Sequence, residues 1–186
     1  MSRIGRLPVS LPQNVTVDVT VDNYVVVTGS KGSLRQYMHP VIKLEKGEVN
    51  GAPAIVLTRE SDVADVKAKH GLYRALIAGM VKGVTEGYSK SLTIHGVGYK
   101  VEVKGDKIVM NIGFSHPVNI EIPEGITATC RSATELVVSG INKEKVGQFA
   151  ADIKAVKPVE PYHGYGIHYT DETVRRKEIK KGSKKK

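Results

Sequence analysis

The sequence has no tryptophan, few aromatic residues and a single cysteine. Because Cys130 has no partner in the chain, an internal disulfide is excluded, and this is typical of a protein from a reducing cytoplasm. We interpret Cys130 as a small core residue. The longest apolar run, Leu76–Val81, is far shorter than the roughly 20 residues needed to cross a bilayer. The N-terminal residues also lack the apolar stretch of a secretory signal. We therefore predict neither membrane insertion nor export.

Motifs for catalysis or cofactor binding are also missing. There is no phosphate-binding loop of the glycine–lysine type, and Gly96–Gly98 matches such a loop only weakly. His163 and His168 are five residues apart, without the further histidine or cysteine ligands that a zinc site needs. No carboxylate pair and no nucleophile with an adjacent base stands out. The sequence predicts no catalytic residues, no metal and no cofactor, and thus no enzyme.

Positive charge is concentrated at the C-terminus. The formal net charge is +9, and residues 174–186 hold eight lysines and arginines but one acid, which gives +7 for this segment. The rest of the chain is nearly neutral. A cationic tail on a neutral body favours binding to phosphate backbones, because each neutralised phosphate releases counterions. A membrane surface is the competing polyanion, but no lipidation motif accompanies the tail.

Hydrophobic periodicity predicts strands followed by a helix in the first half. Alternation over 14–21 and a second apolar stretch over 24–28, separated by Asp22-Asn23, indicate a hairpin. Weaker strands are expected at 41–44 and 54–57, separated by turns at Lys46-Gly47 and Asn50-Gly51. Ser61 or Asp62 suits a helix N-cap. The expected helix ends near Gly83, and apolar residues and one histidine recur on one face at intervals of three or four: Val63, Val66, His70, Tyr73, Ile77 and Met80. We expect His70 to be partly buried and hydrogen-bonded.

The second half repeats this pattern. Strands are expected at 92–94, 99–103, 108–112 and 118–122, followed by a hairpin over 126–139. Asn142 can cap a second helix, whose apolar face comprises Val146, Phe149, Ile153 and Val156. A shift of 111 residues places Val25–Gly29 on Leu136–Gly140 without a gap, which suggests an internal duplication.

We therefore predict an α+β fold of two duplicated small domains. Each domain would be a mostly antiparallel sheet packed against one helix. The expected boundaries are 1–82 for the first repeat, 83–173 for the second and 174–186 for a basic C-terminal extension.

The stretch 158–177 differs from the repeated pattern. Its prolines end the preceding helix, and we expect neither a helix nor a plain strand. Two glycines allow close approach, and three ring side chains lie beside them, just before a basic run. These residue types in this order are typical of a surface for a large anionic partner, although an ordered loop that merely closes the domain would use a similar composition. The ring and glycine residues are Tyr162, His163, Gly164, Tyr165 and Gly166.

Several segments, in order along nearly the whole chain, resemble one family. They are His70–Ile77, Met80–Tyr88, Gly96–Lys100, Gly113–Val118 and the stretch from Pro161 to Lys177. The family is bacterial ribosomal protein six of the large (50S) subunit. This resemblance implies two duplicated α+β domains in a cytoplasmic ribonucleoprotein. It also implies binding to 23S rRNA, mainly through the second domain, near the base of the factor-binding stalk and close to translation GTPases. Neighbouring large-subunit proteins would be further partners.

The chain departs from the family at two positions. His163 and Tyr165 stand where the family usually has lysines. The family's two phosphate-pairing charges are thus replaced by rings that can stack on bases or sugars.

We expect the rRNA contacts to come from three groups of residues. Lysines on and after the second helix add charge, the ring and glycine residues contact ribose, bases and phosphates, and the basic run clamps phosphates. The cationic candidates are Lys154, Lys157, Arg175, Arg176, Lys177, Lys180 and Lys181. The alternative hypothesis is a protein-binding, β-rich adapter whose basic tail only increases solubility.

Overall fold

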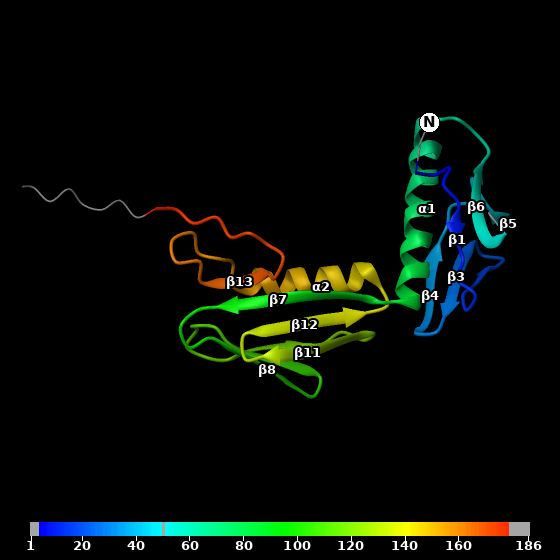
Figure 1. Cartoon of the computed structure of the whole chain (residues 1–186). Coiled ribbons are helices and arrows are strands. Elements are labelled where there is room, and N and C mark those ends of the chain that lie inside the picture. Colours follow the sequence, from blue (N-terminus) through cyan, green and yellow to red (C-terminus); the bar gives the residue numbers. More distant parts are fainter. Residues whose placement is uncertain (1–3, 50, 179–186) are drawn as a thin grey trace, which may run out of the picture. The chain divides into compact units, whose positions relative to one another are not determined.

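A computed structural model describes residues 4–49 and 51–178. The chain forms two compact units: residues up to Tyr88 with Ile141–Lys143 make the first, and Ser89–Gly140 with the residues from Glu144 onward make the second. Each unit contains sheets and one long helix (Figure 1). No described helix is long and apolar enough to cross a membrane.

The first unit contains two three-stranded sheets, with strand orders β1-β6-β5 and β2-β3-β4, and helix α1. Its strands are β1 (Val9–Ser10), β2 (Thr16–Val19), β3 (Tyr24–Gly29), β4 (Gly32–Tyr37), β5 (Ile42–Val49) and β6 (Ala52–Arg59). Helix α1 spans Ala64–Thr85. Its apolar face packs with buried strand residues such as Val17, Val27 and Ile55 in one core. The expected hairpins and helix are therefore confirmed.

The second unit has the same organisation with one added strand. Its sheets have the orders β10-β9-β8 and β11-β12-β7-β13. Its strands are β7 (Tyr88–His95), β8 (Lys100–Lys104), β9 (Lys107–Asn111), β10 (Val118–Glu121), β11 (Ile126–Ser132), β12 (Glu135–Gly140) and β13 (Gly166–Tyr169). Helix α2 spans Lys143–Val156 and begins directly after Asn142. Eight strand pairings of the described residues are antiparallel. This confirms the predicted α+β class.

The duplication is real, but its predicted spacing is wrong. The sheet orders pair β1, β6 and β5 with β7, β12 and β11, and β2, β3 and β4 with β8, β9 and β10. This correspondence needs a shift of about 84 residues, as from Thr16 in β2 to Lys100 in β8. The shift of 111 residues instead laid the β2–β3 hairpin on the β11–β12 hairpin. The two hairpins look alike in sequence, because alternation of apolar and polar residues shows only that a segment is a pleated strand. It does not show where that strand lies in the sheet.

Three local predictions also need correction. The N-cap of helix α1 is Val63, whose side chain cannot cap the helix. The Asp62 carboxylate instead pairs with Arg59 at 2.7 Å. Lys46-Gly47 lies inside β5 and is not a turn. Cys130 is exposed on β11 and is not a core residue.

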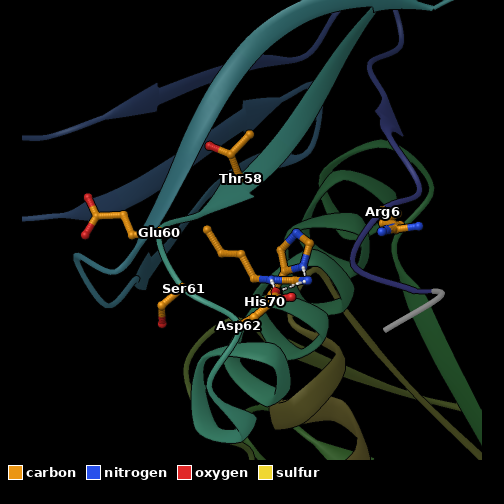
Figure 2. Close-up of a pocket in the computed structure, with 7 residues that line it drawn as sticks. Arg6, Thr58, Glu60, Ser61, Asp62 and His70 are labelled. Atoms are coloured by element: carbon orange, nitrogen blue, oxygen red, sulfur yellow. Dashed lines mark hydrogen bonds and ion pairs between the residues drawn. The ribbon is translucent and has the colours of Figure 1, made fainter. Parts of the chain in front are cut away.

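His70 is buried as predicted, with 4% of its surface exposed. Its Nε2 donates to the Leu57 carbonyl oxygen at 2.9 Å, and its Nδ1 accepts from the Arg59 guanidinium at 3.0 Å. Because a carbonyl can only accept and a guanidinium can only donate, the ring is the neutral Nε2–H tautomer. His70 thereby ties α1 to β6, and Figure 2 shows its ring among the residues that line a pocket beside β6.

Candidate nucleic-acid interface

The stretch after α2 folds back on the second unit and ends in a strand. β13 pairs with β7, so that Gly166 lies opposite His95 and Tyr169 lies opposite Leu92. The expectation that 158–177 contains no strand is therefore wrong for Gly166–Tyr169. The strand forms because β7 offers a free edge and Ile167 is completely buried there. Among the described residues of the first unit, no strand occupies the corresponding place beside β1, so β13 is the addition that distinguishes the second unit (Figure 1).

Both glycines of the stretch let the backbone pack against itself. Gly164 and Gly166 have φ values of +77° and +144°, a region that L side chains rarely adopt. A Cβ on Gly166 would lie 2.7 Å from the Pro158 carbonyl oxygen. The Gly164 amide donates to the Glu160 carbonyl oxygen at 3.0 Å. This amide is thus engaged within the loop, and both glycines are buried. Both glycines shape the loop, and the approach of their amides to phosphate stays a prediction.

The ring side chains form a row on this loop. The rings of His163 and Tyr165 are stacked, with centroids 5.4 Å apart, and the His95 ring lies 5.5 Å from that of Tyr165. Tyr162 is 49% exposed. The position of His95 was missed from sequence because it lies about seventy residues away, and only the β7–β13 register brings it to the loop. Such a row of partly exposed rings offers π-faces on which bases or sugars can stack.

The two helix lysines have different surroundings. The Nζ of Lys154 lies 2.6 Å from the Glu172 carboxylate and 4.8 Å from the Tyr169 ring centroid. Its charge is therefore already paired within the unit. The Nζ of Lys157 lies 4.7 Å from the ring centroid of Phe114. Within the described residues no carboxylate pairs with Lys157, which leaves its charge available for a partner.

The basic run follows the loop closely. The Lys177 amide donates to the Pro161 carbonyl oxygen at 2.8 Å. The Arg176 guanidinium lies across Gly164, since a Cβ there would be 2.8 Å from its Nε. Arg175, Arg176 and Lys177 are exposed. The other two predicted cations, Lys180 and Lys181, lie outside the described residues.

The pair between Lys154 and Glu172 fastens this stretch to α2. Glu172 also accepts a hydrogen bond from the Tyr169 amide at 3.2 Å. The Lys154 ammonium, with smaller help from this amide, lowers the pKa of the Glu172 carboxyl below its usual value. Because the pKa of Glu172 is lower in the folded protein, the pair with Lys154 stabilises the fold above the ordinary glutamate pKa of about 4.3. This stabilisation is lost as the pH falls through the pKa that Glu172 has in the folded protein.

We predict that Glu172→Gln removes this pH-dependent contribution. The free energy of unfolding at pH 7 should fall by at most about 1 kcal/mol, because the pair is partly exposed. Thermal unfolding between pH 7 and pH 3 measures the effect, and the variant should lose less stability on acidification than the wild type. Glu124→Gln, which changes an exposed carboxylate of the same unit, is the control. Identical pH profiles for wild type and Glu172→Gln would refute the role of the pair.

The described part of the chain also contains a polar pocket in the first unit. The pocket between β6 and α1 contains Arg6, Arg59, Asp62 and His70 among its lining residues (Figure 2). Its polar groups are engaged with one another, as Arg59 binds both Asp62 and His70. Among residues 4–49 and 51–178, no cluster of three or more histidine, cysteine or acidic side chains could hold a metal ion.

A protein-family model and similar known proteins point to the same family. The family model described as Ribosomal protein L6 matches residues 11–87 and again 95–170, in agreement with the 84-residue spacing of the two units. A protein of Clostridium beijerinckii named large ribosomal subunit protein uL6 is 52% identical over 186 residues, covering 99% of this chain and 100% of the relative. The protein of that name from Clostridium acetobutylicum is 50% identical over 182 residues, covering 98% and 99%. The chain therefore belongs to the ribosomal protein L6 family.

Proposed function

We propose that the second unit of this protein binds large-subunit (23S) rRNA through the stretch from Lys157 to Lys177. As a member of the L6 family, the chain is a structural, non-enzymatic constituent of the large ribosomal subunit and acts in translation in the bacterial cytoplasm. The observation that carries the proposal is the juxtaposition of exposed cations with a row of rings on one folded loop, on the unit that has the added strand β13.

Each part of the loop has a distinct task in this proposal. Arg175, Arg176 and Lys177 pair with phosphates, and arginine can do so with two parallel hydrogen bonds. Tyr162, His163 and Tyr165 contact ribose or exposed bases. Gly164 and Gly166 set the shape of the loop. Lys154 holds the loop on α2 through Glu172 and contributes less to the RNA contact than we expected from sequence.

The location within the subunit is a further part of the proposal. The family resemblance supports a site near the base of the factor-binding stalk, close to translation GTPases and to neighbouring large-subunit proteins. The alternative, a protein-binding adapter with a solubilising tail, predicts partner binding that ignores rRNA and survives removal of the tail. Family membership favours the ribosomal role.

The binding of full-length protein and of a chain ending at Thr173 to intact large-subunit rRNA tests the proposal. Affinities are measured across a salt series with excess competitor RNA. We expect the full chain to outcompete random RNA. The shortened chain should keep part of this preference. Its binding should depend less on salt, and the slope of log affinity against log salt concentration should flatten by about 0.9 for each phosphate that it no longer neutralises. If neither chain prefers rRNA to the competitor, the proposed site is wrong and the adapter hypothesis is favoured.

A further inference from the structure

We propose that Phe114 forms a second stacking site, which binds an unpaired RNA base beside the loop described above. The inference rests on the proposed function, because it assigns a further contact to the same RNA-binding unit. Phe114 lies in the connection between β9 and β10, far in sequence from the stretch 157–177. Neither the sequence patterns nor the family match assigns it a role.

The two phenylalanines of the chain differ in their exposure. The sequence contains two phenylalanines. Phe149 is a core residue with 5% of its surface exposed, whereas Phe114 is 45% exposed. An exposed phenylalanine has no polar atom to interact with water, so its ring gains most when a partner covers it.

The groups that surround Phe114 favour a nucleic acid as this partner. The Lys157 Nζ lies 4.7 Å from its ring centroid, and the His116 ring is stacked nearly parallel to it at 6.3 Å, with an angle of 19°. A base can stack on the rings of Phe114 and His116 while the Lys157 ammonium, which lies over the Phe114 ring in the free protein, turns to the phosphate of that nucleotide. An acidic peptide would use the ammonium but not the aromatic face.

The loop that carries Phe114 is held in place. Gly113 has φ +78°, and a Cβ there would lie 2.9 Å from the Tyr99 hydroxyl. The Tyr99 ring also covers Gly96, where a Cβ would be 2.5 Å from a ring carbon. Tyr99 therefore joins the β7–β8 and β9–β10 connections. A site built on fixed loops loses little conformational entropy when it binds.

This site is continuous with the proposed rRNA-binding loop. The Lys157 carbonyl oxygen accepts a hydrogen bond from the Ile167 amide at 2.9 Å, which joins the end of α2 to β13. On the other side, the His95 ring lies 5.5 Å from the Tyr165 ring, and His95 is followed directly by the connection that Tyr99 packs against. Rings and cations thus extend from His163 to Phe114 within one unit. A single RNA strand can contact both sites.

The test compares Phe114→Leu, Phe114→Tyr and Lys157→Met in full-length protein, with large-subunit rRNA and a salt series. Leucine keeps an apolar side chain but removes the π-face, so the affinity should fall about ten-fold with an unchanged salt slope. Tyrosine keeps the face and should bind as the wild type. Lys157→Met should flatten the slope by about 0.9. Leu72→Ala, at a 53% exposed apolar residue of the first unit, is the control and should have no effect.

Three outcomes would overturn the inference. If wild-type protein selects rRNA and Phe114→Leu binds equally well, the ring does not contact a base, while the proposed function stands. If Phe114→Leu changes only incorporation into the subunit and not binding to naked rRNA, the ring contacts a protein. If the wild type shows no preference for rRNA, the proposed function itself fails. Thermal unfolding of each variant verifies that the fold is intact.

Discussion

Gly166→Ala is expected to disrupt the proposed rRNA-binding loop and to destabilise the second unit. The new Cβ would lie 2.7 Å from both the Pro158 carbonyl oxygen and the Val159 Cα, and these backbone atoms cannot move aside without opening the loop. The φ of +144° adds strain. Overpacking and backbone strain of this kind together cost roughly 2–5 kcal/mol. We expect a clear fall in the melting temperature and loss of preference for large-subunit rRNA.

A second glycine separates the two causes. Gly125 also has a positive φ, +82°, but no atom of the described residues lies within 4 Å of its Cβ position. Gly125→Ala therefore measures backbone strain alone, about 1 kcal/mol. Chemical denaturation gives both free energies of unfolding. If the two variants have the same stability, the close packing of Gly166 on Pro158 and Val159 is not a determinant of the loop.

Replacing Arg175, Arg176 and Lys177 together by glutamine is expected to weaken rRNA binding about a hundred-fold at low salt. These side chains are exposed and pair with no carboxylate among the described residues, so the folded protein should tolerate the change. The log–log salt slope should flatten by about 2–3, because three phosphates would no longer be neutralised. Filter binding or fluorescence anisotropy across a salt series measures both quantities.

The matched control removes the same charge from the first unit. Lys43, Lys46 and Lys67 each pair with a carboxylate there, and their replacement by glutamine changes the net charge equally. We expect the control to alter affinity less than about five-fold, through long-range attraction alone. Equal effects of both triple variants would indicate that binding depends on total charge and not on a site.

The sequence was sufficient to predict the fold class, the duplication and most strands. Alternating valines and the four- and three-residue spacing of Val66, His70 and Tyr73 depend on local geometry, which sequence records directly. The sequence could not supply the correct repeat spacing, because the strands of every hairpin show the same alternation of apolar and polar residues. It also contained no sign of β13, because Gly166–Tyr169 becomes a strand only through the free edge of β7.

The same distinction applies to the candidate site. Charge and ring content were visible in 158–177, but the partners of each side chain were not. Lys154 is paired with Glu172 eighteen residues away, and the Gly164 amide is engaged by Glu160. His95 and Phe114 reach the site only through strand register and loop packing. Sequence thus supplied the candidate segment, whereas tertiary contacts determine which of its groups can meet a partner.

Ultraviolet crosslinking of the protein within assembled large subunits, followed by mass spectrometry, tests the central claim most directly. The account predicts nucleotide-bearing peptides from 157–177, centred on Tyr162, His163 and Tyr165, with a second group from 95–117. The first unit should give few such peptides. Nucleotide crosslinks confined to the first unit, with none from 157–177, would contradict the proposed interface.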